Sequence, residues 1–69
     1  MNEISERIKT LRMRKKLSQK GLARLAGTSL SHIQHIESGY IASPRFDTLE
    51  KIADALKVSR EKFFAKGKG

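Results

Sequence analysis

Residues 17–39, LSQKGLARLAGTSLSHIQHIESG, constrain the fold most, because they hold two helix starts and two helix stops. Ser18 and Ser29 each precede an apolar-periodic run. A serine hydroxyl at that position accepts a backbone N–H that the helix start leaves unbonded. Gly27 and Gly39 follow the runs, and glycine readily adopts the positive φ of a helix exit. The stretch therefore predicts two short helices joined by a tight glycine turn.

Each of these two helices has one apolar face, at the i, i+3, i+4 spacing or close to it. The residues of these faces are Leu22, Leu25 and Ala26 in the first helix, and Leu30, Ile33 and Ile36 in the second. Gly21 interrupts the first helix, where glycine costs about 1 kcal/mol relative to alanine. Either a backbone approaches closely there, or the helix is weaker than it could be.

A further amphipathic helix is expected before residue 17. It begins at Asn2 or Ser5 and runs to about Lys15 or Lys16. Its apolar stripe consists of Ile4, Ile8 and Leu11. The basic residues on its other faces fit a solvated surface and the favourable position of cations near a helix C-terminus.

Two helices are expected after residue 39. Pro44 disfavours helix at the preceding residue and favours the start of the next helix. The apolar positions of that helix are Phe46, Leu49, Ile52, Ala53 and Leu56. Ser59 caps a last short helix over residues 60–64. Residues 65–69, AKGKG, are expected to form a flexible polar tail that has no reason to fold.

These elements predict an all-α fold of five helices in one small domain, residues 1–64, because 69 residues suffice for a single core. The residues expected in that core are Ile4, Ile8, Leu11, Leu17, Leu22, Leu25, Ile33, Ile36, Leu49, Ile52, Leu56, Val58 and one or both of Phe63 and Phe64.

The charge of the chain favours a nucleic-acid partner. Fifteen Lys and Arg residues against seven Asp and Glu give a net charge of +8, and the isoelectric point is about 10.3. This is the footprint of a phosphate-backbone binder, although a basic soluble surface or a membrane-surface peptide would share it. No apolar run approaches the length of a transmembrane helix, and the N-terminus lacks a secretory signal. The absence of cysteine excludes disulfides and thiol catalysis and fits a cytoplasmic protein.

Residues 17–39 resemble the helix-turn-helix of the phage repressor and Cro family, also called the Xre-like family. The matching residues are Ser18, Gln19, Leu22, Ala23, Ala26, Gly27, Ser29, Ile33, Ile36, Glu37 and Gly39. The match continues on both sides of the motif, over about residues 4–64. The resemblance implies a compact five-helix, lambda-repressor-like DNA-binding domain. It also implies that a recognition helix, about residues 29–38, enters the major groove of DNA.

By this resemblance, the base-contacting residues are Leu30, Ser31, Gln34 and His35. Leu30 is open to two interpretations, a contact with a thymine methyl group or an ordinary exposed leucine. His35 offers N–H donors to guanine or to a phosphate.

The phosphate contacts implied by the resemblance are Arg12, Gln19, Ser29, Ser38 and Arg45, with Arg14, Lys16 and Lys20 as longer-range contributors. Phosphate contacts position a protein on the duplex without specifying the sequence. Arg12 and Glu37 are expected to form a structural salt bridge that holds Arg12 beside a phosphate.

The expected function is that of a transcriptional regulator, in particular a repressor, which binds operator DNA as a homodimer and needs no cofactor. Tyr40 and Ile41 are candidates for dimer contacts, or for packing back on the core. His32 and His35 lack the third ligand of a zinc site. No catalytic constellation, small-molecule site or membrane segment is evident. The alternatives are an antitoxin or restriction-modification controller with the same domain, and a protein-interaction or coactivator module.

Overall fold

The computed structural model describes residues 3–63, which form four α-helices and a short 3-10 helix joined by turns and loops. The helices are α1 (Glu3–Arg14), α2 (Gln19–Ala26), α3 (Leu30–Ser38), α4 (Phe46–Leu56) and η1 (Arg60–Phe63). No strand occurs between residues 3 and 63. The predictions for Asn2, Phe64 and the tail at 65–69 lie outside the described residues.

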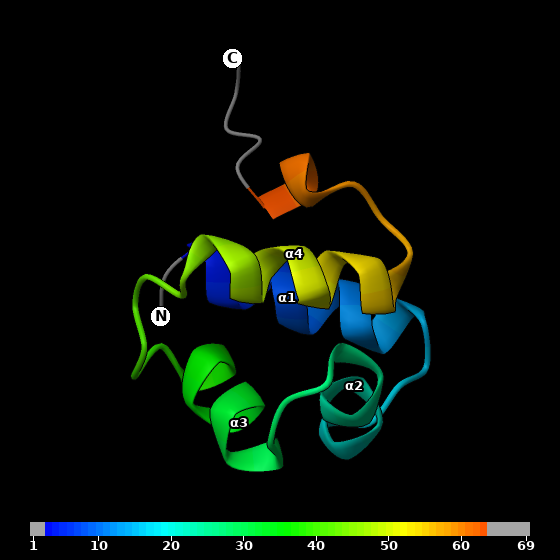
Figure 1. Ribbon diagram of the computed structural model, residues 1–69, viewed down its shortest axis with the longest axis horizontal. Helices are drawn as coiled ribbons and strands as arrows, with labels where there is room; N and C mark the ends of the chain where they lie inside the picture. Colours follow the sequence, from blue (N-terminus) through cyan, green and yellow to red (C-terminus); the bar gives the residue numbers. More distant parts are fainter. Residues whose placement is uncertain (1–2, 64–69) are drawn as a thin grey trace.

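The helices enclose a single apolar core. In Figure 1, α1 and α4 form one layer, α2 and α3 lie on one side of it, and η1 lies on the other. Every element contributes a side chain to the core. The apolar residues at most 5% exposed are Ile8, Leu22, Ala23, Ala26, Ile33, Ile36, Leu49, Ile52, Ala53, Leu56 and Phe63. Ile4, Leu11, Leu17, Ile41, Ala55 and Val58 pack against them with partial exposure.

The predicted helix-turn-helix is confirmed at its four boundaries. Ser18 caps α2 by accepting from the backbone N–H of Gly21, at 2.9 Å. Ser29 caps α3 by accepting from the N–H of His32, at 3.1 Å. Gly27 and Gly39 adopt left-handed φ values of 71° and 88°. The two helices are therefore fixed by local chemistry at both ends.

Lysines in the left-handed conformation end the other two long helices. Lys16 has φ 59° and Lys57 has φ 58°. Because of this exit, α1 ends at Arg14, slightly before the predicted end. Its first turn includes Ser5, which is 1% exposed, so this residue is buried inside the helix and is not its start, one of the two positions that we considered.

The close neighbour of Gly21 is the helix cap. A Cβ atom at this position would lie 3.2 Å from Ser18 Oγ and 3.6 Å from Leu17 Cδ2. Both atoms belong to side chains at the start of the same helix, so no backbone from another helix requires this glycine.

Two further details of the predicted fold are wrong. Leu25 is 59% exposed, because α2 presents Leu22, Ala23 and Ala26 to the core. The small Ala23 takes the place that we had given to Leu25.

The fifth helix is a single turn of 3-10 helix and not an α-helix, so the domain has four α-helices in the described residues. A segment this short has too few residues to propagate α-helical hydrogen bonds. It is held by the N–H of Lys62, which donates to Ser59 O at 2.9 Å, and by burial of Phe63.

Candidate nucleic-acid interface

The helix α3 is anchored along one side and open along the other. Ile33 and Ile36 are fully buried, and Glu37 is 2% exposed. Four predicted base-contacting residues lie on the open side, and all four are exposed: Leu30, Ser31, Gln34 and His35. The structure therefore brings them together on one helix face, in the i, i+4 pairs Leu30 with Gln34 and Ser31 with His35.

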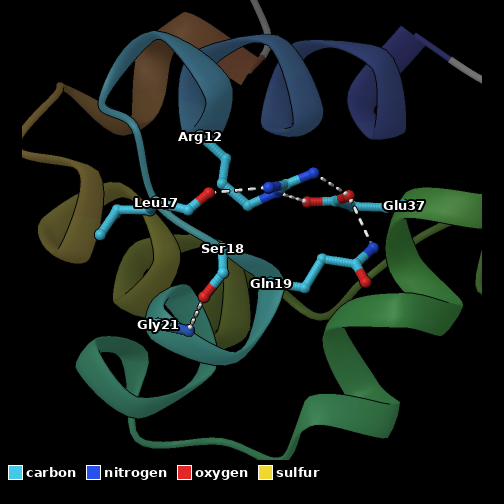
Figure 2. A network of polar contacts seen from close by, with 6 residues as sticks. All are labelled: Arg12, Leu17, Ser18, Gln19, Gly21 and Glu37. Carbon is cyan, nitrogen blue, oxygen red and sulfur yellow. Dashed lines mark hydrogen bonds and ion pairs between the residues drawn. The ribbon is translucent and has the colours of Figure 1, made fainter.

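A polar network fixes the buried side of α3 to the two preceding helices (Figure 2). Arg12 from α1 forms two contacts with Glu37 from α3, Nε to Oε2 at 2.7 Å and Nη2 to Oε1 at 3.1 Å. Arg12 Nη1 also donates to the carbonyl oxygen of Leu17, at 2.7 Å. The exposed fractions of the two charged side chains are 13% for Arg12 and 2% for Glu37. Charges removed from water to this extent are stable only when they are well paired.

Gln19 belongs to the same network. Its Nε2 atom donates to Glu37 Oε1 at 3.0 Å from the first residue of α2. The side chain is half-buried, with its amide between the start of α2 and the end of α3 (Figure 2). The resemblance had given Gln19 a phosphate contact alone, and the structure adds a bond that joins α2 to α3.

The starts of α2 and α3 differ electrostatically from those of the other long helices. Neither helix has an acidic residue in its first turn, whereas α1 has Glu3 and Glu6 there and α4 has Asp47. The unbonded N–H groups of a helix start carry partial positive charge and favour anions. The starts of α2 and α3 are therefore the ones without a nearby carboxylate of their own helix to compete with a phosphate.

The other predicted phosphate-contacting residues lie in different settings. Ser29 is exposed, and its hydroxyl caps α3. Ser38 donates to the carbonyl oxygen of His35 and accepts from the N–H of Tyr40, both at 3.2 Å. Arg45, just before α4, is 84% exposed and pairs with Asp47 at 3.4 Å.

The two histidines of α3 point to different partners. His32 Nδ1 and Thr28 Oγ1 share a hydrogen bond of 2.8 Å at the turn before α3.

No group of three or more potential metal-binding side chains occurs in the described part of the chain. Within the same part, no helix has the length and apolar character that crossing a membrane requires.

His35 has a ring contact that the sequence reasoning missed. Its imidazole lies 5.0 Å from the ring of Tyr40, centroid to centroid, at an interplanar angle of 48°. Of the two loop residues considered for the core, only Ile41 packs there, and Tyr40 is 80% exposed. Gly39 gave the signal, because the residue after a glycine helix exit often packs on the last turn of the helix.

The chain that forms these helices matches a known class of protein. The helix-turn-helix family HTH_3 matches residues 8–63, most of the chain. The chain belongs to this family, of the Xre and Cro type.

A curated relative is similar over almost the whole chain. The HTH-type transcriptional repressor RghR of Bacillus subtilis (strain 168) is 36% identical over 61 residues. These cover 88% of this chain and 45% of the relative. The chain therefore spans less than half the length of the curated relative that it matches.

Proposed function

We propose that this protein is a transcriptional repressor that binds double-stranded DNA in a sequence-specific manner, with α3 in the major groove. The main observation in support is the exposed face of α3, a helix whose opposite side is buried. This face is formed by Leu30, Ser31, Gln34 and His35. A major groove admits one α-helix, and side chains near its N-terminal end reach the base edges.

The polar network supports this function because it keeps α3 in one orientation. Arg12 uses one N–H of each guanidinium nitrogen on Glu37 and Leu17. A guanidinium has five N–H donors, so two remain for a phosphate oxygen. Arg12 thereby joins the scaffold to the DNA backbone, and Gln19 and the start of α2 lie beside it.

The mechanism follows from this division of tasks. The basic side chains and the starts of α2 and α3 bind the phosphates and set the position of the domain on the duplex. The face of α3 then selects the sequence. Occupation of an operator in this way blocks transcription, and the repressor relative supports repression over the antitoxin and controller alternatives.

The proposal includes binding as a homodimer. Domains of this kind occupy two half-sites about one helical turn, roughly 34 Å, apart. The expected operator is therefore a palindrome, and the expected location of the protein is the cytoplasm, together with the DNA that it regulates.

The test is selection of bound duplexes from a random pool, followed by affinity measurements on the enriched sequence over a range of salt concentrations. We expect a palindromic sequence and a logarithm of the binding constant that falls linearly with the logarithm of salt concentration. The slope is about −0.9 for each phosphate neutralised. An unenriched pool would refute sequence-specific binding, and affinity that does not change with salt would refute the phosphate contacts.

A further inference from the structure

The contact between His35 and Tyr40 joins a proposed base-contacting residue to a loop residue that we had considered only for dimer contacts or core packing. Tyr40 lies beyond the end of α3, and 80% of its surface is exposed. A ring this exposed contributes little apolar burial to folding. Its contact with His35, at 5.0 Å between ring centroids, falls within the range of favourable aromatic pairs.

The backbone on both sides of Tyr40 is tied to the end of α3. The N–H of Tyr40 donates to Ser38 Oγ at 3.2 Å, and the same hydroxyl donates to His35 O at 3.2 Å. The N–H of Ile41 donates to His35 O at 3.0 Å, and the Ile41 side chain packs on the core. These bonds hold the backbone of Tyr40 at the end of α3, where its ring contacts the imidazole of His35.

We propose that Tyr40 is a positioning residue for base recognition: its ring restricts the imidazole of His35 to one orientation, so that His35 presents a fixed edge to its base pair. This inference rests on the proposed function, because it concerns how His35, one residue of the proposed DNA-reading face, is oriented. An exposed imidazole otherwise loses side-chain freedom when it binds, and restricting it beforehand lowers that cost.

The direct test compares the duplexes selected by the wild-type chain with those selected by Tyr40→Ala, Tyr40→Phe, His35→Ala and the double variant Tyr40→Ala/His35→Ala. We expect Tyr40→Ala to relax the preference at the same base pair as His35→Ala. The ratio of affinities for the preferred and substituted base pairs should fall about two- to tenfold, the size of an aromatic pair contribution. Tyr40→Phe keeps the ring and should keep the preference, and the double variant should match His35→Ala.

A second measurement follows the ring contact without DNA. The ring of Tyr40 should shift the NMR signals of the carbon-bound protons of the His35 imidazole. We expect that shift to persist in Tyr40→Phe and to disappear in Tyr40→Ala, with the thermal unfolding of both variants close to wild type. Met13→Ala removes another exposed apolar side chain, 61% exposed on α1, and should change neither the shift nor the base preference.

Several results would overturn the positioning role. These are equal weakening of all sequences by Tyr40→Ala, a change at a base pair that His35→Ala does not affect, and a loss in Tyr40→Phe as large as in Tyr40→Ala. Wild-type enrichment together with an unchanged preference in Tyr40→Ala would refute this inference alone. A wild-type chain that enriches no sequence would refute the proposed function and the positioning role with it.

Discussion

Arg12 and Glu37 join the first helix of the domain to the end of α3 through a two-point contact, at 2.7 Å and 3.1 Å. Gln19 bonds to the same carboxylate from the start of α2. One nearly buried carboxylate therefore connects three helices. The contacts of Glu37 therefore have two effects: they stabilise the domain, and they fix the orientation of α3, the proposed DNA-reading helix.

The first prediction concerns the loss of that carboxylate. Glu37→Ala leaves Arg12 and Gln19 without their shared acceptor, in a place where water does not fully replace it. Removal of one partner of a buried pair is strongly destabilising, so we expect a loss of about 3 kcal/mol in the free energy of unfolding. For a domain of this size the midpoint of thermal unfolding should fall by more than about 10 °C.

The matched control is the pair of Glu3 and Arg7 on α1, with an N–O distance of 3.2 Å and exposed fractions of 59% for Glu3 and 33% for Arg7. Glu3→Ala removes the same kind of group from a solvated pair and should change stability by less than about 1 kcal/mol. Equal thermal unfolding of the Glu37→Ala and Glu3→Ala variants would contradict the connecting role of Glu37.

The second prediction concerns the turn of the helix-turn-helix. Gly27 has φ 71°, and a Cβ atom there would meet no heavy atom within 4 Å. Gly27→Ala therefore adds backbone strain without a steric clash, and we expect a cost of about 1 kcal/mol in denaturant unfolding. Gly27→Asn should cost less, because asparagine tolerates the left-handed conformation better. Equal stability of the alanine variant and wild type would show that the turn relaxes.

The sequence predicted those parts of the fold that depend on local chemistry. Ser18 and Ser29 cap helices with their own hydroxyls, and Gly27 and Gly39 take the only backbone conformation that their turns allow at low cost. Each feature involves residues within a few positions of one another. The residues proposed for the open face of α3 came instead from the family resemblance, and the burial of Ile33 and Ile36 on the opposite side is consistent with that choice.

The missed features depend on tertiary packing. The apolar spacing placed Leu25, and not Ala23, on the buried face of α2. The packing of α2 against α3 and α4 reverses this, and that packing cannot be read from the helix alone. Gln19 is a helix start in the sequence, and its bond to Glu37 needs the end of α3 beside it. The ring of Tyr40 on His35 likewise depends on how the chain leaves Gly39.

The third prediction decides between the two interpretations of Leu30, which is 39% exposed at the start of α3. If it packs on a thymine methyl group, replacement of that thymine by deoxyuridine should weaken binding about fourfold, the value of one buried methyl-sized group. Leu30→Ala should weaken binding to the thymine duplex and remove most of the difference between the two duplexes. The replacement is tested at each thymine of the enriched site. If the wild-type chain binds the thymine and deoxyuridine duplexes equally at every one of them, Leu30 is an ordinary exposed leucine.

The fourth prediction concerns Arg45, which is 84% exposed beside the start of α4 and which we propose as a phosphate contact. Arg45→Ala should weaken binding to all sequences alike and reduce the slope of the salt dependence by about 0.9, as expected for one phosphate. Lys62→Ala is the control, because Lys62 is an exposed cation on η1, across the layer of α1 and α4 from the helix-turn-helix (Figure 1). This variant should retain the wild-type slope. Equal reductions of the slope in both variants would mean that net charge, and not a contact at Arg45, sets the slope. A changed base preference in Arg45→Ala would mean that this arginine contacts bases and not only phosphates.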